Sequence, residues 1–235
     1  MKKKIISLSL VYIMIHLTFL SAAQEVHWGV KGGGNMSAML LKDENGYYKV
    51  KLQPGFHVGG LAEFTLSEKF AIQSSLLFTT KGYKHDKDGF SNQLLGVDMV
   101  KYTSYYLELP VNAVFKPEVG SGTLLLGAGP YLAYGLGGKW KAVNDGYGTT
   151  GTLKFLNNYQ SSDSTLGGNT KKLPYTKPLD FGANILVGYE FFNNFFFHVN
   201  GQVGLIDVDP SYNGISDEKS FQKTVQFGLT LGYKF

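Results

Sequence analysis

Residues 221–235, Phe-Gln-Lys-Thr-Val-Gln-Phe-Gly-Leu-Thr-Leu-Gly-Tyr-Lys-Phe, decide the fold class. Apolar side chains occupy the odd positions from Val225 to Phe235, and the even positions from Gln222 to Lys234 carry polar residues or glycine. Within this stretch only Lys223 interrupts the apolar series. Because successive side chains of a β-strand point to opposite faces, the stretch predicts one long strand with an apolar face and a polar face.

The same alternation recurs upstream, so the sequence predicts eight strands in all. Beyond residue 23, no apolar run is long enough to cross a bilayer as a helix, and no stretch shows helical periodicity. The seven further segments are 26–36, 56–66, 70–81, 104–115, 124–136, 179–191 and 195–205.

The connections between these segments switch regularly between short and long. Short ones fall at 67–69, 117–122 and 192–194, and polar, glycine-containing long ones at 38–54, 83–101, 138–177 and 208–220. Antiparallel up-and-down strands put all short turns at one end and all long loops at the other, as outer-membrane barrels do. We therefore expect an all-β fold, a transmembrane up-and-down antiparallel β-barrel of eight strands, in which strand eight closes on strand one.

The N-terminus predicts export. Lys2, Lys3 and Lys4 precede an apolar run, and small residues follow at 21–23, as in a secretory signal peptide. We expect residues 1–23 to be removed and residues 24–235 to form one outer-membrane barrel domain. Removal would leave 19 lysines against 18 acidic residues, so the mature chain would be almost neutral.

Composition excludes several function classes. The chain has no cysteine, which excludes disulfides and thiolate metal sites, and its low charge and high aromatic content argue against disorder. Every basic residue is lysine, so the guanidinium that reads bases is missing and nucleic acid is not an expected partner.

Six short segments occur along the mature chain in the order 29–35 (GVKGGGN), 105–110 (YYLELP), 127–135 (GAGPYLAYG), 180–184 (DFGAN), 188–191 (GYEF) and 231–235 (LGYKF). Together they resemble the PorT-like outer-membrane β-barrel family of the Bacteroidetes. The resemblance spans essentially the whole mature chain and implies an outer-membrane barrel of eight strands. A few members of that family are linked to secretion and gliding machinery.

Strand parity places charged residues of both signs inside the barrel. Eight strands leave an interior that side chains can fill, so we expect a paired polar network that stabilises the lumen. The alternative is a narrow polar passage or ligand pocket. The expected network consists of Lys31, Glu63, Lys81, Glu108, Asp180, Glu190 and Lys234, beside His27, His57, His198, Gln73, Gln202 and Gln226.

Neither a metal nor an enzymatic site is expected, and no cofactor is predicted. His27 and His198 belong to the periplasmic end and His57 to the opposite end, so three histidines should not converge. The best enzymatic candidate is His85 with Ser91 in the second long loop, which reads more simply as a solvated turn without an orienting group.

The long third loop is the most distinctive surface. We expect it to expose lysines and aromatic rings that contact lipopolysaccharide phosphates or another envelope protein. The expected function is a non-enzymatic outer-membrane module that acts through its extracellular loops; the alternative is a small passive channel or a barrel component of a secretion or gliding apparatus. The candidate surface comprises Lys139, Trp140, Lys141, Lys154, Lys171 and Lys172, beside the rings of Tyr147, Phe155 and Tyr159.

Overall fold

The computed structural model describes residues 25–43, 46–48, 50–86, 98–159, 172–192, 194–212 and 220–235. The expected signal peptide, residues 1–23, lies outside these ranges and stays a prediction. Within the described residues, no helix is long and apolar enough to cross a membrane.

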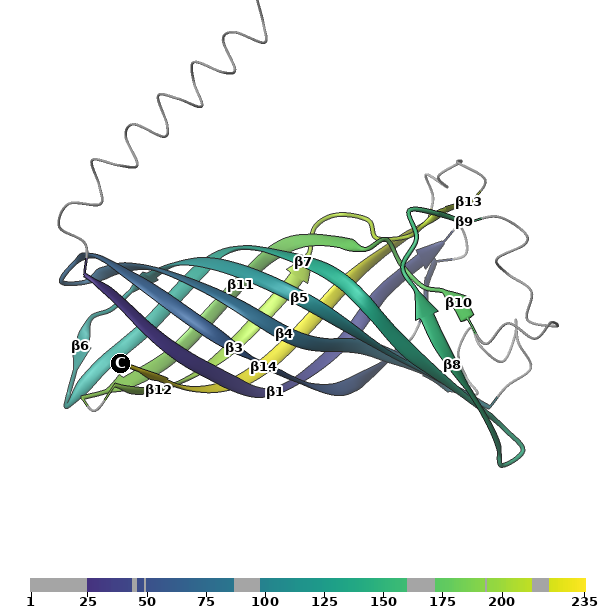
Figure 1. The fold of residues 1–235 in the computed structure, drawn as a ribbon, viewed down its shortest axis with the longest axis horizontal. Helices are drawn as coiled ribbons and strands as arrows, with labels where there is room; N and C mark the ends of the chain where they lie inside the picture. The colour runs from purple at the N-terminus through teal and green to yellow at the C-terminus, as the bar shows by residue number, and fades with distance from the viewer. Residues whose placement is uncertain are drawn as a thin grey trace, which may run out of the picture.

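In the described part of the chain, eight long strands form the wall of the molecule (Figure 1). Six shorter strands are attached at its ends: β2 (Gly46–Tyr48), β6 (Glu118–Val119), β8 (Tyr147–Lys154), β9 (Asn158–Tyr159), β10 (Lys172–Pro174) and β13 (Ser211–Tyr212). The long strands are β1 (Val26–Asp43), β3 (Lys51–Ser67), β4 (Phe70–Asp86), β5 (Met99–Phe115), β7 (Gly122–Asn144), β11 (Leu179–Phe191), β12 (Phe195–Gly204) and β14 (Phe221–Lys234).

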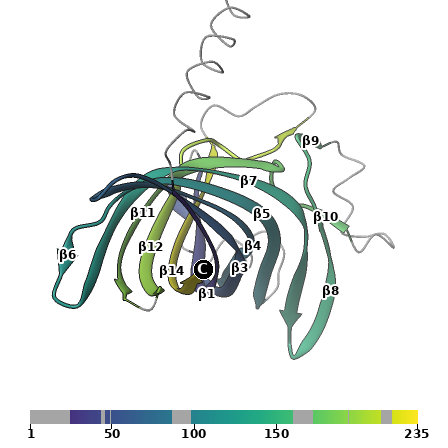
Figure 2. The same cartoon turned by 60° about the vertical axis from the view of Figure 1, so that its left-hand side comes forward.

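The long strands close into a ring. Each pairs with its neighbours in the order β7-β11-β12-β14-β1-β3-β4-β5, and β5 pairs back to β7. Figure 2 shows them side by side around the wall. Every pairing between them is antiparallel. The prediction of an eight-stranded up-and-down barrel is confirmed.

The first and last long strands complete the ring. Their register runs from Gly29 opposite Lys234 to Lys42 opposite Phe221, and the backbone N–H of Phe235 donates to the carbonyl of Trp28 at 2.9 Å. In lipid an unpaired strand edge would leave backbone groups without hydrogen bonds, so this pairing lets the sheet cross a membrane.

The alternation in the sequence separates lipid from lumen. On β14, Phe227, Leu229 and Leu231 expose 57%, 66% and 69% of their surface on the outside of the ring, whereas Gln226 and Thr230 are buried inside. Rings of exposed apolar side chains continue around the other long strands. This outward apolar surface is the one that lipid covers.

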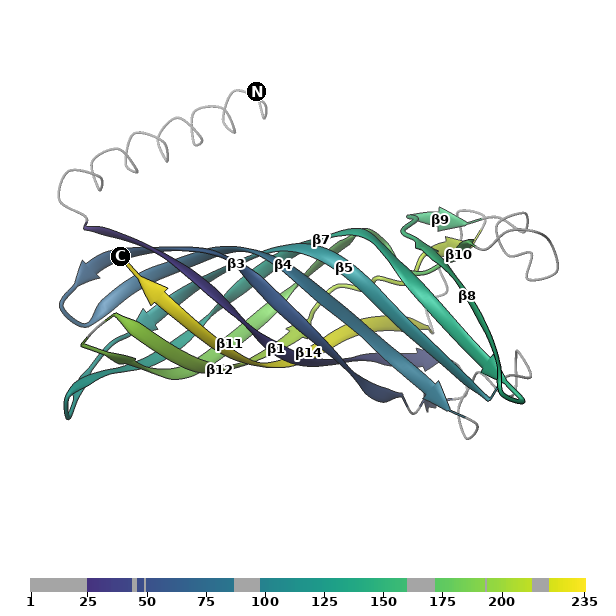
Figure 3. The same cartoon turned by 60° about the horizontal axis from the view of Figure 1, so that its bottom comes forward.

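All short turns lie at one end. The strand ends that flank the short connections at 68–69, 116–121 and 192–194 lie at the same end as the C-terminus of β14 (Figure 3), and the strand ends that flank the longer connections lie at the other. In outer-membrane barrels short turns are periplasmic and longer loops extracellular, which orients the molecule.

At the extracellular end the strands run further than expected. β1 continues to Asp43, β4 to Asp86 and β7 to Asn144, where β8 folds back as a hairpin. The long loops predicted at 38–54, 83–101 and 138–177 are therefore partly wrong. Strand pairing needs a backbone partner and not an apolar outer face, so the wall continues beyond the lipid with lysine and threonine on its outside.

A bulge in β7 changes which residues face outward. Tyr105 of β5 pairs with Gly137 and the next residue, Tyr106, with Gly135, so Leu136 is the extra residue. Gly137 has a φ of 149°, a conformation that L-residues rarely adopt. Before the bulge even positions such as Leu136 face outward; after it, Lys139 faces outward and Trp140 inward.

Candidate functional site

The periplasmic end of the lumen is closed by two lysines and two glutamates. The ammonium of Lys234 lies 2.6 Å from a carboxylate oxygen of Glu63 and 2.7 Å from one of Glu190. The ammonium of Lys116 contacts the same two carboxylates at 2.5 and 3.2 Å, and the Gln73 amide donates to Glu63 at 3.1 Å. Each charge is paired twice, as buried charges require.

Lys116 comes from the turn that follows β5. Burial by itself would lower the pKa of its ammonium, but the Glu63 carboxylate, and after it Glu190, outweigh burial and raise that pKa above its usual value. Lys116 lies one residue beyond the predicted segment 104–115 and so was missing from the expected lumen network. Even positions of β5 face inward, so extending that parity by one residue beyond Phe115 would have found it.

An apolar layer lies between this group of two lysines and two glutamates and the middle of the barrel. Its five inward side chains are Leu61, Val114, Leu125, Leu186 and Phe196. The Phe196 ring lies over Gly232, where a Cβ would come within 2.2 Å of the ring, so this position needs glycine. The layer separates the periplasmic charges from those at mid-barrel.

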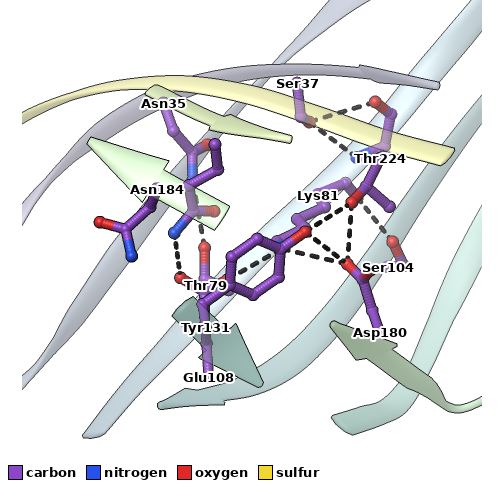
Figure 4. A network of polar contacts seen from close by, with 12 residues as sticks. Asn35, Ser37, Thr79, Lys81, Ser104, Glu108, Tyr131, Asp180, Asn184 and Thr224 are labelled. Carbon is purple, nitrogen blue, oxygen red and sulfur yellow. Dashed lines mark hydrogen bonds and ion pairs between the residues drawn. The ribbon is translucent and has the colours of Figure 1, made fainter. Parts of the chain in front are cut away.

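A second ion-pair network fills the middle of the barrel (Figure 4). The ammonium of Lys81 lies 2.8 Å from Glu108 and 3.5 Å from Asp180, and it also lies 4.6 Å from the ring centroid of Tyr131. The hydroxyls of Tyr131 and Thr224 donate to Asp180 at 3.2 and 2.8 Å. β4, β5, β7, β11 and β14 each supply one member of the network.

A small cavity lies beside this network. Its volume accessible to water is about 20 Å³, which suffices for a single water molecule and not for an open channel. Lys31, His57 and His198 line it together with Glu108 and Gln202. The expectation that His57 and His198 lie at opposite ends is wrong, because His57 bonds at 2.9 Å to Thr230, the residue paired with His198.

The extracellular mouth is closed by aromatic side chains. The buried ring of Tyr175 stacks on the rings of Tyr83 and Tyr102. It also meets the Phe155 ring edge-to-face, with ring centroids 5.7 Å apart. Beneath them the hydroxyls of Tyr106 and Thr176 are 3.5 Å apart. Burial raises the pKa of the Tyr175 phenol well above its usual value, so this cap is uncharged.

Backbone hydrogen bonds hold the cap in place. The N–H of Leu156 donates to the carbonyl of Thr176 at 3.1 Å, and the N–H of Tyr175 donates to that of Lys154 at 3.0 Å. The N–H of Gly135 in the wall donates to Pro178 at 2.7 Å. Residues 154–156 and 175–178 thus form a strap bonded to the barrel.

All seven residues of the expected lumen network face inward. Glu190 is partly buried at 14% exposure and the others are buried. In the part of the chain that the structure describes, lumen charges of the two signs balance. They are Lys31, Lys81, Lys116 and Lys234 against Glu63, Glu108, Asp180 and Glu190.

The expected loop surface needs correction. Trp140 is only 8% exposed and belongs to the aromatic cap, as does Phe155, because the bulge turned β7 over. Lys139, Lys141 and Lys154 are exposed on the outer wall, and Tyr147 is exposed at the hairpin turn. Lys171 lies outside the described residues. Lys172 is described only by its backbone pairing to Thr152, and the ring of Tyr159 is not described.

The second loop was also predicted wrongly around His85. This residue belongs to β4, is 3% exposed and packs edge-to-face on Tyr83, so it is not part of a solvated turn. Ser91, its proposed partner, lies outside the described residues. In the ranges that the structure describes, no three histidine or carboxylate side chains are grouped so as to hold a metal ion.

Sequence comparison supplies the family. Residues 22–209 match the family described as outer membrane protein beta-barrel domain. The chain belongs to this family. It is an outer-membrane protein, as the alternation, the closed ring and the apolar outer surface predict. No curated protein is similar enough in sequence to count as a match.

Solved structures resemble this outer-membrane β-barrel in fold. Ail, the attachment invasion locus protein of Yersinia pestis, is 12% identical with a TM-score of 0.41, and the match covers 90% of this chain and 99% of Ail. Neisserial surface protein A is 10% identical with a TM-score of 0.40, covering 88% and 97%. The outer-membrane enzyme PagL is 12% identical with a TM-score of 0.38, covering 85% and 98%.

Proposed function

We propose that this outer-membrane barrel is a closed, non-enzymatic module that anchors in the membrane and acts through its extracellular end. The observation that carries the proposal is the closure of the lumen at three heights: the group of Glu63 and Lys234, the network of Lys81, and the strap that contains Tyr175. A barrel filled in this way offers no continuous aqueous path, so its function would lie on its outside.

The extracellular extension supports an interaction role. β7 and β8 form a hairpin beyond the lipid-facing part of the wall (Figure 1), with Tyr147 at its turn 84% exposed. The hairpin is tied to the wall by the pairing of Met99–Ser104 with β7, which gives a preformed surface. Rigid surfaces lose little entropy on binding.

We also propose that the barrel is a PorT-like protein. The segments at 29–35, 105–110 and 127–135 support a PorT-like protein of the Bacteroidetes. Such a protein would meet other envelope proteins, and a barrel component of a secretion or gliding apparatus is the corresponding alternative role. Co-purification of a defined set of envelope proteins with the full-length barrel would favour it.

Planar-bilayer recording tests the closed barrel. We expect no conductance steps from the folded wild-type protein. The matched variants Lys31→Ala and Glu108→Ala each remove one side chain that lines the central cavity, and neither should open a path because the periplasmic group and the cap remain. Steady conductance of the wild type that either variant abolishes would establish a channel and contradict the proposal.

Site-specific photo-cross-linking in cells tests the interaction surface. A cross-linker at Tyr147, in the hairpin turn, should capture envelope or surface partners. The control is Phe192, which is 81% exposed in a turn at the periplasmic end. Equal capture from both positions, or capture only from Phe192, would contradict an extracellular role.

A further inference from the structure

Four lysines stand opposite one another across four adjacent strands. Lys51 of β3 pairs with Lys84 of β4, Lys84 with Lys101 of β5, and Lys101 with Lys141 of β7. We call these four residues the lysine row. Its last member pairs onward with Thr150 of β8, and Lys139 stands two residues below it on the same face of β7.

The juxtaposition of Lys84, Lys101 and Lys141 is electrostatically unfavourable by itself. Directly opposed residues of an antiparallel pair have Cβ atoms roughly 5 Å apart, and like charges at that distance destabilise the sheet. None of the described acidic residues forms an ion pair with Lys84, Lys101, Lys139 or Lys141. An anion lying across the strands would relieve the repulsion.

The outer wall is hollowed at this place. A groove of about 560 Å³ runs between β5, β7 and β8. The ammonium and hydroxyl groups on its walls can donate hydrogen bonds to phosphate oxygens. The groove is lined by Lys101, Thr103, Lys139, Trp140, Lys141, Thr150, Gly151 and Thr152.

The groove lies at the height of lipid headgroups. On β7 the exposed apolar side chain of Leu136 precedes Lys139 by three residues, about 10 Å along a strand. A tilted strand at this distance from the apolar surface has entered the headgroup layer. The side chains of Lys139 and Lys141 point away from the barrel axis, into the headgroup layer, because the bulge at Gly137 reversed the parity of β7.

We propose that the lysine row, with Lys139, binds the phosphate groups of the lipid A part of lipopolysaccharide in the outer leaflet. The proposal rests on the extracellular surface of the proposed function and gives it a ligand. Lipid A fits because its phosphates lie at the extracellular interface, beside the apolar wall. A glycolipid with two phosphates can also span several strands of the row, which one headgroup phosphate cannot.

Native mass spectrometry of the full-length protein in detergent tests the proposal, with diphosphoryl lipid A as the probe. The variant Lys101→Gln/Lys139→Gln/Lys141→Gln should lower the apparent affinity at least about tenfold, since each interfacial lysine contributes on the order of a few-fold or more. Lipid A stripped of its phosphates should bind wild type as weakly as diphosphoryl lipid A binds this variant.

The matched control removes the same charge elsewhere. Lys42 and Lys223 lie on β1 and β14, and Lys69 in a periplasmic turn. The variant Lys42→Gln/Lys69→Gln/Lys223→Gln should retain wild-type affinity within about twofold. An equal loss in both triple variants would show general charge attraction only and would overturn the proposal.

A single charge reversal separates binding from folding. Lys101→Glu places a carboxylate between Lys84 and Lys141, so it should raise the melting temperature without lipid while weakening lipid A binding. Unchanged binding by a folded Lys101→Glu protein would overturn the lysine-row proposal and leave the closed barrel intact. Ion conductance by the wild-type protein would instead contradict the closed barrel and leave the lysine-row proposal intact.

Discussion

Lys81 of β4 and Glu108 of β5 form an ion pair at the centre of the barrel, with 2.8 Å between ammonium nitrogen and carboxylate oxygen and with 4% and 1% of their side chains exposed. Asp180 lies 3.5 Å from the same ammonium, and the Gln202 amide donates to the other oxygen of Glu108 at 2.6 Å. The Lys81 ammonium therefore contacts two buried carboxylates, and both lose this ion pair without it.

Lys81→Met should strongly destabilise the barrel. It leaves Glu108 and Asp180 buried beside one another without their cation, and breaking a buried pair typically costs about 3–5 kcal/mol. Urea unfolding in lipid vesicles, followed by loss of the heat-modifiable form, measures the free energy of unfolding.

Two companion variants sharpen that measurement. Lys139→Met removes an exposed lysine and should change stability by less than about 1 kcal/mol. Lys81→Met/Glu108→Gln should recover part of the loss because it removes one orphaned carboxylate. A Lys81→Met protein as stable as wild type would show that this pair does not hold the centre of the barrel.

Lys116 predicts a pH dependence at the alkaline side. Its pKa is raised above the usual 10.5 because Glu63 and Glu190 outweigh burial, so the folded state favours the ammonium. The resulting stability is fully present below the usual pKa and is lost as the pH rises through the raised one. Near neutral pH the free energy of unfolding of the wild type should exceed that of Lys116→Gln by about 2 kcal/mol. This difference in stability should narrow above about pH 10.5.

The comparison needs an exposed lysine as its control. Lys69 lies in a neighbouring periplasmic turn and is exposed, and Lys69→Gln should track wild type across the same pH range. If the difference in free energy of unfolding between wild type and Lys116→Gln grew at high pH, the predicted pH dependence would be wrong in sign.

Gly137 should be intolerant of a side chain for backbone reasons alone. An added Cβ would meet nothing within 4 Å, but φ is 149°, so Gly137→Ala should lower the free energy of unfolding by about 1–3 kcal/mol. Gly34 has open space for a Cβ and no positive φ, and Gly34→Ala is the matched control. Equal stability of the two alanine variants would contradict the assignment of strain to the bulge.

Deleting Gly137 should have a larger effect than replacing it. With one residue fewer, the bulge would be lost, Trp140 would turn to the outside and Lys139 into the closed cap, so we expect no heat-modifiable barrel. A deletion variant that folds and still exposes Lys139 to amine-reactive reagents would show that another residue supplies the bulge.

The two tryptophans should report opposite surroundings. Trp140 is 8% exposed inside the cap, whereas Trp28 is 59% exposed on the outer wall. In vesicles, brominated acyl chains should quench Trp28 in a Trp140→Phe protein and spare Trp140 in a Trp28→Phe protein. Aqueous acrylamide should also spare Trp140; strong quenching there would mean that the cap is open.

Much of the barrel could be predicted from alternation. The outward series of β14, from Val225 to Phe235, follows directly from a period of two, and so does the inward position of Glu108 and Asp180. One face of each strand must meet lipid and the other must fill a narrow lumen, so the pattern has one solution. The short turns and the closure followed from the same reasoning.

Parity could not be carried through the extracellular end. There the outer face meets water and no longer requires apolar side chains, so Lys139 and Lys141 looked like loop residues although they continue β7. A bulge shifts parity by one residue without changing composition, which hid the inward position of Trp140. His57 and His198 line the same central cavity because the stagger between strands sets them at one height along the barrel axis. No single strand encodes that stagger.

Alternation alone specified the fold class, the eight strands and, apart from Lys116, the charged residues inside, because burial in lipid and in a narrow lumen acts on each strand separately. Which charges pair, where the wall ends and which lysines stand side by side depend on how the strands assemble in the folded barrel. Lys84, Lys101 and Lys141 are far apart in sequence, and only the register between strands makes them one surface. Register is a property of neighbouring strands, fixed by their hydrogen bonds and bulges.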